Sequence, residues 1–93
     1  MDIIWTNCAI NEYKNVILYL LEEWTSKEAQ EFIDNSNSVL SEICITPYMF
    51  KASQTHPYMR KGKITKHSSF IYQVDNNEII ILRVIDNRSD ELH

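Results

Sequence analysis

The spacing of the apolar residues changes at Pro47, and this change limits the fold more than any other feature of the sequence. Before Pro47, residues 9–24 and 29–44 place apolar side chains three and four positions apart. That spacing is typical of amphipathic helices. After Pro47 the apolar residues alternate with polar ones or run on without a break, as they do in strands. The sequence therefore predicts two helices followed by a group of strands.

Both predicted helices have start signals. Thr6 and Asn7 offer an N-cap for the first helix, because their side chains can accept a hydrogen bond from a free backbone N–H. Residues 25–28, Thr-Ser-Lys-Glu, match the capping box, in which the Thr hydroxyl and the Glu carboxylate satisfy each other's backbone N–H groups. Since only a residue or two separates the helices, we expect an antiparallel helix hairpin.

Four segments are typical of strands. Residues 3–5 are a short β-prone run, and residues 58–64 form a basic, solvent-facing candidate that contains the single glycine. Residues 69–74 alternate between apolar and polar, and residues 79–85 are nearly continuously apolar, as in a central strand covered on both faces. Residues 75–77, Asp-Asn-Asn, predict a tight turn between the last two strands.

These elements predict an α+β fold with the order β-α-α-β-β-β, a helix hairpin packed on a mainly antiparallel four-stranded sheet. We expect a single domain over residues 1–93, because the chain is too short for two. The last three strands form a meander. The first strand must join the same sheet, since alone it would be unstable, but its partner strand cannot be deduced.

The composition predicts a globular protein without a membrane span. Hydrophobic residues make up 44% of the chain, and the longest apolar run, residues 16–21, is far too short to cross a bilayer. The first residues lack the basic start of a signal peptide. Two cysteines without a secretory signal indicate a reducing compartment, so we expect the cytoplasm.

The charge is unevenly distributed along the chain. Residues 1–50 hold two bases and eight acids, a net charge of −6, whereas residues 51–93 hold seven bases and five acids, a net charge of +2. The stretch 51–70 has no acid at all. Its five bases are Lys51, Arg60, Lys61, Lys63 and Lys66. A polyanion such as RNA would meet this stretch, although charge alone favours an ordinary solvated surface.

Several kinds of chemistry find no support in the sequence. One glycine cannot build a Gly-rich phosphate loop, so the usual nucleotide cofactors are not expected. The cysteines and histidines are scattered without the spacing of metal ligands, and we expect neither metal nor cofactor. Cys8 and Cys44 are expected to be structural. A disulfide between them, or a nucleophilic Cys8 at a helix N-terminus, is the alternative.

Arg83 interrupts an otherwise apolar strand, where an unpaired charge would be costly. It must therefore form an ion pair or lie on an open face. The first alternative predicts a partner among Asp75, Glu78 and Asp86. The second predicts a concave patch that holds phosphate, since a guanidinium group makes paired hydrogen bonds to phosphate oxygens. The patch would be lined by Arg60, Lys61, Lys63, Lys66, Arg83 and Arg88.

The pattern resembles the RelE/ParE superfamily of bacterial toxins from type II toxin–antitoxin modules. The matching stretches are Ile3-Ile4-Trp5-Thr6, Leu20-Leu21 with Trp24, Phe32-Ile33, Pro47 with Phe50, Tyr58-Met59-Arg60, Phe70-Ile71-Tyr72-Gln73-Val74, and residues 79–84 followed by Asp86-Asn87-Arg88. Their order and spacing cover almost all of the chain. The resemblance implies the same β-α-α-β-β-β fold, growth inhibition and a role in plasmid stabilisation.

The resemblance leaves three functions open. ParE-type members block DNA gyrase, whereas RelE-type members cut messenger RNA on the ribosome. Ser69 stands where the RNA-cutting members carry an arginine, and no tyrosine follows Arg88, so the chain is more similar to the ParE type. If it is an endoribonuclease, the catalytic candidates are Arg60, Arg83, Arg88 and His67. A non-toxic partner with the same fold, acting in binding or autorepression, is the third possibility.

The resemblance also implies a cognate antitoxin, encoded beside the gene, that forms a hetero-oligomer with the toxin. Antitoxin segments commonly lay an apolar helix or strand into a groove. Exposed apolar side chains that the isolated fold leaves uncovered would bind such a segment. The candidates are Tyr19, Trp24 and Phe50.

Overall fold

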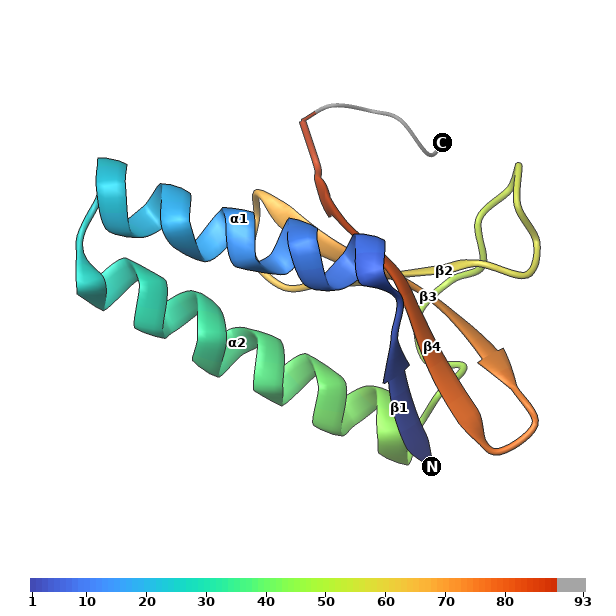
Figure 1. Ribbon diagram of the computed structural model, residues 1–93. Helices are drawn as coiled ribbons and strands as arrows, with labels where there is room; N and C mark the ends of the chain where they lie inside the picture. Colours follow the sequence, from blue (N-terminus) through green and yellow to red (C-terminus); the bar gives the residue numbers. More distant parts are fainter. Residues whose placement is uncertain (89–93) are drawn as a thin grey trace.

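The computed structural model describes residues 1–88 and has the predicted order of elements (Figure 1). The elements are β1 (Asp2–Trp5), α1 (Asn7–Glu23), α2 (Ser26–Ile45), β2 (Arg60–Lys63), β3 (Ser68–Asp75) and β4 (Glu78–Asp86). The α+β fold and the helix hairpin are thus confirmed.

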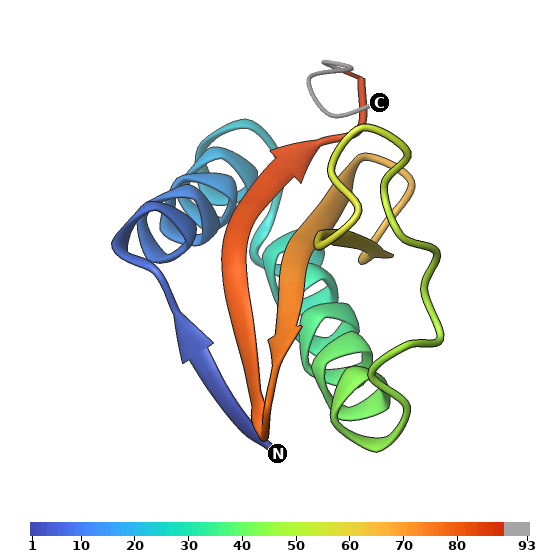
Figure 2. The same ribbon diagram turned by 90° about the vertical axis from the view of Figure 1, so that its right-hand side faces the viewer.

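The four strands form one mixed sheet with the order β1-β4-β3-β2. β2, β3 and β4 pair antiparallel as a meander, while β1 pairs parallel to β4, with Ile4 opposite Ile80. Figure 2 shows β4 lying between β1 and β3. The partner of the first strand, which the sequence left open, is therefore the last strand of the sheet.

The predicted caps are present at both helix starts. Thr6 is the N-cap of α1, and its hydroxyl accepts the Ala9 N–H at 3.1 Å while lying 2.9 Å from the Leu82 carbonyl of β4. At the start of α2, the Thr25 N–H donates to the Glu28 carboxylate at 3.2 Å, as a capping box requires. Neither helix of the described region is long and apolar enough to cross a membrane.

The hydrophobic core lies between the hairpin and the sheet. Phe70, Tyr72 and Ile81 present fully buried side chains from the strands, and they meet Phe32 and Ile43 of α2. Tyr72 satisfies its hydroxyl by donating to the Pro47 carbonyl at 2.8 Å. The predicted Asp-Asn-Asn turn is also present, with Asn76 at a positive φ of 54°.

A register shift interrupts the pairing of β3 with β4. Ile71 lies opposite Arg83, yet the next residue of β3, Tyr72, lies opposite Ile81. One residue of β4, Leu82, is therefore extra, as in a β-bulge. The bulge locally bends the strand just before Arg83, the residue that breaks the apolar pattern of β4.

Candidate functional site

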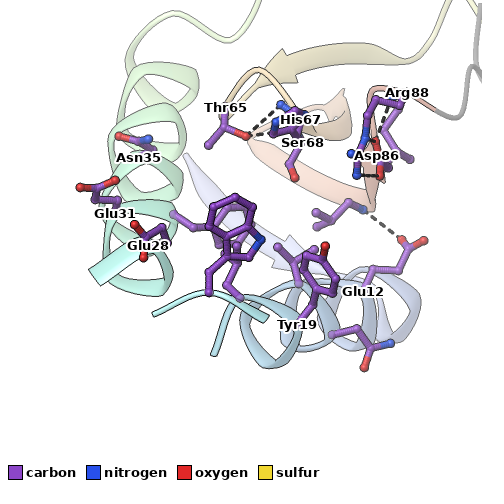
Figure 3. A pocket seen from close by; sticks show the side chains of 17 residues that line it. Glu12, Tyr19, Glu28, Glu31, Asn35, Thr65, His67, Ser68, Asp86 and Arg88 are labelled. Carbon is purple, nitrogen blue, oxygen red and sulfur yellow. Dashed lines mark hydrogen bonds and ion pairs between the residues drawn. The ribbon is translucent and has the colours of Figure 1, made fainter. Parts of the chain in front are cut away.

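A groove with a volume of about 660 Å³ opens between the helix hairpin and one end of the sheet (Figure 3). Its apolar wall consists of Val16, Tyr19, Leu20, Trp24, Phe32, Val84 and Ile85. Its polar rim consists of Glu12, Asn15, Glu28, Glu31, Asn35, Thr65, His67, Ser68, Asp86 and Arg88. The volume is in the range of ordinary ligand-binding clefts, and the lining combines apolar walls with a few charged groups.

Helix periodicity places these side chains on one surface. Glu12, Val16 and Tyr19 follow one another at spacings of four and three along α1, and Glu28, Glu31 and Asn35 do so at spacings of three and four along α2. Figure 3 shows Glu28, Glu31 and Asn35 along α2, with Tyr19 and Glu12 on the neighbouring α1. The groove is therefore built into the two helices rather than into a loop.

Two predicted antitoxin-binding residues line this groove. Tyr19 is 52% exposed and Trp24 is 61% exposed, although both side chains are large and aromatic. Side chains of this kind mark surfaces that a partner covers. The prediction that the isolated fold leaves them uncovered is confirmed.

The third residue, Phe50, does not lie in the groove. It is half-buried, and its ring lies edge-on to that of Tyr72, with centroids 6.4 Å apart. A Cβ at Gly62 would lie 3.4 Å from Phe50 and from Ile43, so the single glycine gives room for this packing. The expectation that Phe50 is exposed was wrong, because the loop before β2 folds back onto the core.

Arg83 forms an ion pair with Glu12 of α1. Its Nη2 lies 2.7 Å from Glu12 Oε2, and the backbone N–H of Val84 donates to the same carboxylate at 3.0 Å. Burial raises the pKa of Glu12, but the hydrogen bonds from Arg83 and Val84 outweigh it and lower the pKa overall. The predicted partners Asp75, Glu78 and Asp86 were wrong, because they were chosen for nearness in sequence, whereas α1 passes beside the bulge.

Arg88 is held by Asp86 at the end of β4. Arg88 Nη2 lies 2.7 Å from Asp86 Oδ2, and Arg88 Nε lies 3.0 Å from Asp86 Oδ1. The side-chain hydrogen bond from Arg88 is the main cause that lowers the pKa of Asp86 to about 2. His67, whose charge acts in the same direction, lies on the rim of the same groove.

Asn87, which sequence reasoning missed, anchors the end of β4 to the turn before β3. Its Oδ1 accepts the Ser69 hydroxyl at 2.7 Å, and its Nδ2 donates to the carbonyl oxygens of Thr65 at 3.3 Å and Lys66 at 3.2 Å. Its backbone N–H donates to the His67 carbonyl at 2.8 Å. The only signal in the sequence is an Asn directly after an apolar strand.

The remaining predicted cations are divided between the two faces of the sheet. Arg60 donates to the Phe50 carbonyl at 2.7 Å and lies over the Tyr48 ring, 4.8 Å from its centroid. Lys61 and Lys63 alternate with Arg60 and are exposed. β3 lies between these lysines and Arg83, so β2 and β4 are not neighbouring strands. Lys66 is exposed in the turn between β2 and β3.

Both cysteines are free thiols. Cys8 is exposed, with its Sγ 3.6 Å from Glu12 Oε1, and the Cys44 Sγ lies 3.9 Å from the Met1 carbonyl. No group of three or more His, Cys, Asp and Glu side chains that could hold a metal ion gathers within residues 1–88.

The sequence matches the family described as "ParE toxin of type II toxin-antitoxin system, parDE" over residues 3–91, nearly the whole chain. The chain belongs to the ParE toxin family. The resemblance to the RelE/ParE superfamily is thereby confirmed, and the chain is a type II toxin–antitoxin toxin of that superfamily.

Solved structures share the fold of this ParE-family toxin. The chromosomal ParDE TA system from P. aeruginosa has a TM-score of 0.75 at 16% identity, covering 92% of this chain and 95% of that chain. The YoeB/ParE toxin from Agrobacterium tumefaciens has a TM-score of 0.71 at 13% identity, covering 94% and 99%. The YoeB-YefM complex from Staphylococcus aureus has a TM-score of 0.67 at 18% identity, covering 91% and 94%. Among curated protein sequences, none is significantly similar to this ParE-family toxin.

Proposed function

We propose that this toxin arrests bacterial growth by inhibiting DNA gyrase, as the resemblance to ParE-type toxins implies. The observation that supports it is the state of the three arginines that an RNA-cutting toxin would use. Arg83 is paired with Glu12, Arg88 is paired with Asp86, and Arg60 donates to a backbone carbonyl. A carboxylate beside a guanidinium group repels the phosphate that the guanidinium would hold.

Cleavage of RNA needs donors aimed at the charge that develops on the scissile phosphate, together with a general acid or base. Ser69 stands at the position where RNA-cutting relatives carry an arginine, and its buried hydroxyl donates to Asn87. His67 is exposed on the rim of the groove, next to the Arg88–Asp86 pair. This arrangement favours binding to a protein target over cleavage of RNA.

The test compares the two targets with one preparation of the full chain. Purified toxin is added to a gyrase supercoiling reaction and, separately, to ribosomes that translate a defined messenger RNA. We expect loss of supercoiling at stoichiometric toxin and intact messenger RNA. In cells, labelled thymidine incorporation then falls before labelled methionine incorporation.

The alternative, a ribosome-dependent endoribonuclease, has one observation in its favour. Ile71 of β3 pairs with Lys61 of β2 on one side and with Arg83 of β4 on the other. Two cations therefore lie on the sheet face away from the core. If the toxin cuts messenger RNA and the double variant Lys61→Ala with Lys63→Ala does not, the gyrase proposal is wrong. If neither target is affected and cells keep growing, the chain is a non-toxic binding partner.

We further propose that a cognate antitoxin neutralises the toxin by binding in the groove. A relative of the same fold is described as a YoeB-YefM complex, and the exposed Tyr19 and Trp24 offer the apolar surface that such a contact needs. Trp24→Ala should weaken binding of the antitoxin encoded beside this gene by at least tenfold, as for a central aromatic contact. Tyr58→Ala removes an aromatic side chain that is even more exposed than Trp24 and lies outside the groove; it is the matched control and should change nothing.

A further inference from the structure

The groove that we assign to the antitoxin carries an excess of negative charge on one wall. Its lining holds four carboxylates, from Glu12, Glu28, Glu31 and Asp86, and one guanidinium group, from Arg88. Those residues sum to −3. Arg88 neutralises Asp86, and Arg83 reaches Glu12 from outside the lining, so the net charge that remains is −2 and belongs to Glu28 and Glu31 on α2.

The two acids on α2 differ in their role inside the fold. Glu28 is half-buried and accepts the N–H of Thr25 in the capping box. Glu31, one turn further along, is exposed and makes no hydrogen bond or ion pair within residues 1–88. Figure 3 shows its side chain on the α2 wall, between those of Glu28 and Asn35. Within residues 1–88 no hydrogen bond or ion pair holds the Glu31 side chain, so its carboxylate can meet a partner.

The apolar side chains and the α2 acids line the same groove. Trp24 and Tyr19 are more than half exposed, and Leu20 and Phe32 close the space behind them. A partner that fills the groove must present apolar side chains to the aromatic wall and a polar flank to α2. This is the geometry of an amphipathic segment, with contacts at i, i+3, i+4 and i+7 when it is helical.

We infer that the occupant of the groove is an amphipathic antitoxin segment with a Lys or Arg on the flank that faces Glu31, and that Glu31 selects it. The inference rests on the proposed function of the groove. The inference is based on charge complementarity. An antitoxin segment with acidic residues opposite Glu28 and Glu31 would place like charges together at the edge of an apolar contact. A nucleic acid, being a polyanion, is repelled by the same wall.

Two synthetic peptides serve as probes of the inference. Both are 16-residue helices with the same Leu stripe, and they differ only in whether the flanking residues are Lys or Glu. Binding to the full-length toxin is followed by the fluorescence polarisation of a labelled peptide. We expect the Lys peptide to bind about five- to tenfold more tightly than the Glu peptide, as for partly exposed charges of opposite rather than equal sign.

Glu31→Lys should abolish that preference, because the new lysine offsets the charge that remains on Glu28. Glu42→Lys, an exposed charge reversal on α2 outside the groove, is the matched control and should leave the preference unchanged. Circular dichroism checks that both variants remain folded. The inference is overturned if the two peptides bind equally, if neither binds, or if Glu31→Lys behaves like Glu42→Lys. Inhibition of gyrase by the unliganded toxin is measured separately, so a failure of the proposed target is distinguishable from a failure of charge selection.

Discussion

At the scale of single residues, Glu12 connects the first helix to the last strand of the sheet. Its carboxylate accepts from the Arg83 side chain and from the Val84 backbone, 71 and 72 positions away in the sequence. The glutamate side chain is only 24% exposed, and that of Arg83 is 38% exposed. The pair is thus shielded enough that removing one member leaves the other charge poorly solvated.

We expect Glu12→Gln to lower the free energy of unfolding by about 1–3 kcal/mol, the usual cost of an unsatisfied group at a charged hydrogen bond. Urea unfolding at neutral pH measures the loss. Glu22→Gln, an exposed position on the same helix, is the control and should change stability little. An equal effect of both substitutions would mean that the ion pair does not stabilise the fold.

The same carboxylate predicts a dependence of stability on pH. The folded-state pKa of Glu12 lies below its ordinary value of 4.5, so folding favours the ionised form. The stabilisation is fully present above pH 4.5 and is lost as the pH falls through the lowered folded-state value. The midpoint of urea unfolding, measured between pH 3 and 7, should therefore decrease less on acidification in Glu12→Gln than in the unmodified protein. Parallel curves would contradict this.

The sequence predicts part of this residue-scale picture. An arginine inside an apolar strand was expected to form an ion pair or to lie on an open face, and Arg83 forms the ion pair. Its partner could not be found, because Glu12 falls on a helical pattern and looks like an ordinary solvent-facing acid. Only the path of α1 beside the bulge at Leu82 brings Glu12 to Arg83. Asn87 was missed for the same reason, since its contacts depend on the turn before β3.

At the scale of elements, the two helix caps are chemically alike but differ in their surroundings. Thr25 caps α2 on the surface, whereas Thr6 caps α1 and also lies within hydrogen-bond distance of two carbonyl oxygens of β4, Ile81 at 3.1 Å and Leu82 at 2.9 Å. Thr6 therefore fixes the angle at which the chain passes from β1 into α1.

We expect Thr25→Ala to cost about 1 kcal/mol and Thr6→Ala to cost about 2 kcal/mol, the upper end of the range for caps. Thermal or urea unfolding of the two variants gives the comparison directly. Conservative Thr→Ser replacements at each position should recover most of the loss, because the hydroxyl is kept. A larger effect at Thr25 than at Thr6 would show that the contacts with β4 contribute nothing.

Most elements could be read from the sequence, since helices, hairpin turns and antiparallel meanders arise from local patterns. The parallel pairing of β1 with β4 could not. Asp2 pairs with Glu78, although the two residues are separated by most of the sequence, and no local pattern specifies such a pair. The groove was likewise absent from the prediction as a cavity, although Tyr19 and Trp24, two of its lining residues, were chosen correctly as exposed.

At the scale of the whole molecule, the fold converts the uneven charge of the sequence into two differently charged regions. The helix hairpin carries most of the acids, and the bases of β2 and the turn after it lie on the far side of the sheet from the helices or at its edge. An antitoxin that covers the hairpin meets an acidic and apolar surface. A target that meets the lysines of β2 encounters a basic one.

We therefore expect the antitoxin to stabilise the folded toxin strongly. At a free antitoxin concentration 1,000 times the Kd, binding adds about 4 kcal/mol to the free energy of unfolding. For a domain of this size each kcal/mol raises Tm by about 4–8 °C, so Tm should rise by more than 10 °C. Differential scanning fluorimetry of toxin alone and of the complex measures it, and Trp24→Ala should reduce the rise. No change in Tm would contradict binding to the folded toxin.

The position of β4 also has a consequence for the timing of synthesis. Within residues 1–88, β4 is the only strand that pairs with β1 and the second that pairs with β3, yet it is the last of these strands to leave the ribosome. At about 5–20 residues per second, β1 emerges several seconds before the strand that it needs. A nascent chain cannot close the sheet during that interval. The groove is therefore complete only after β4 has been synthesised. An antitoxin that is already present in the cell can bind the toxin as soon as the groove forms.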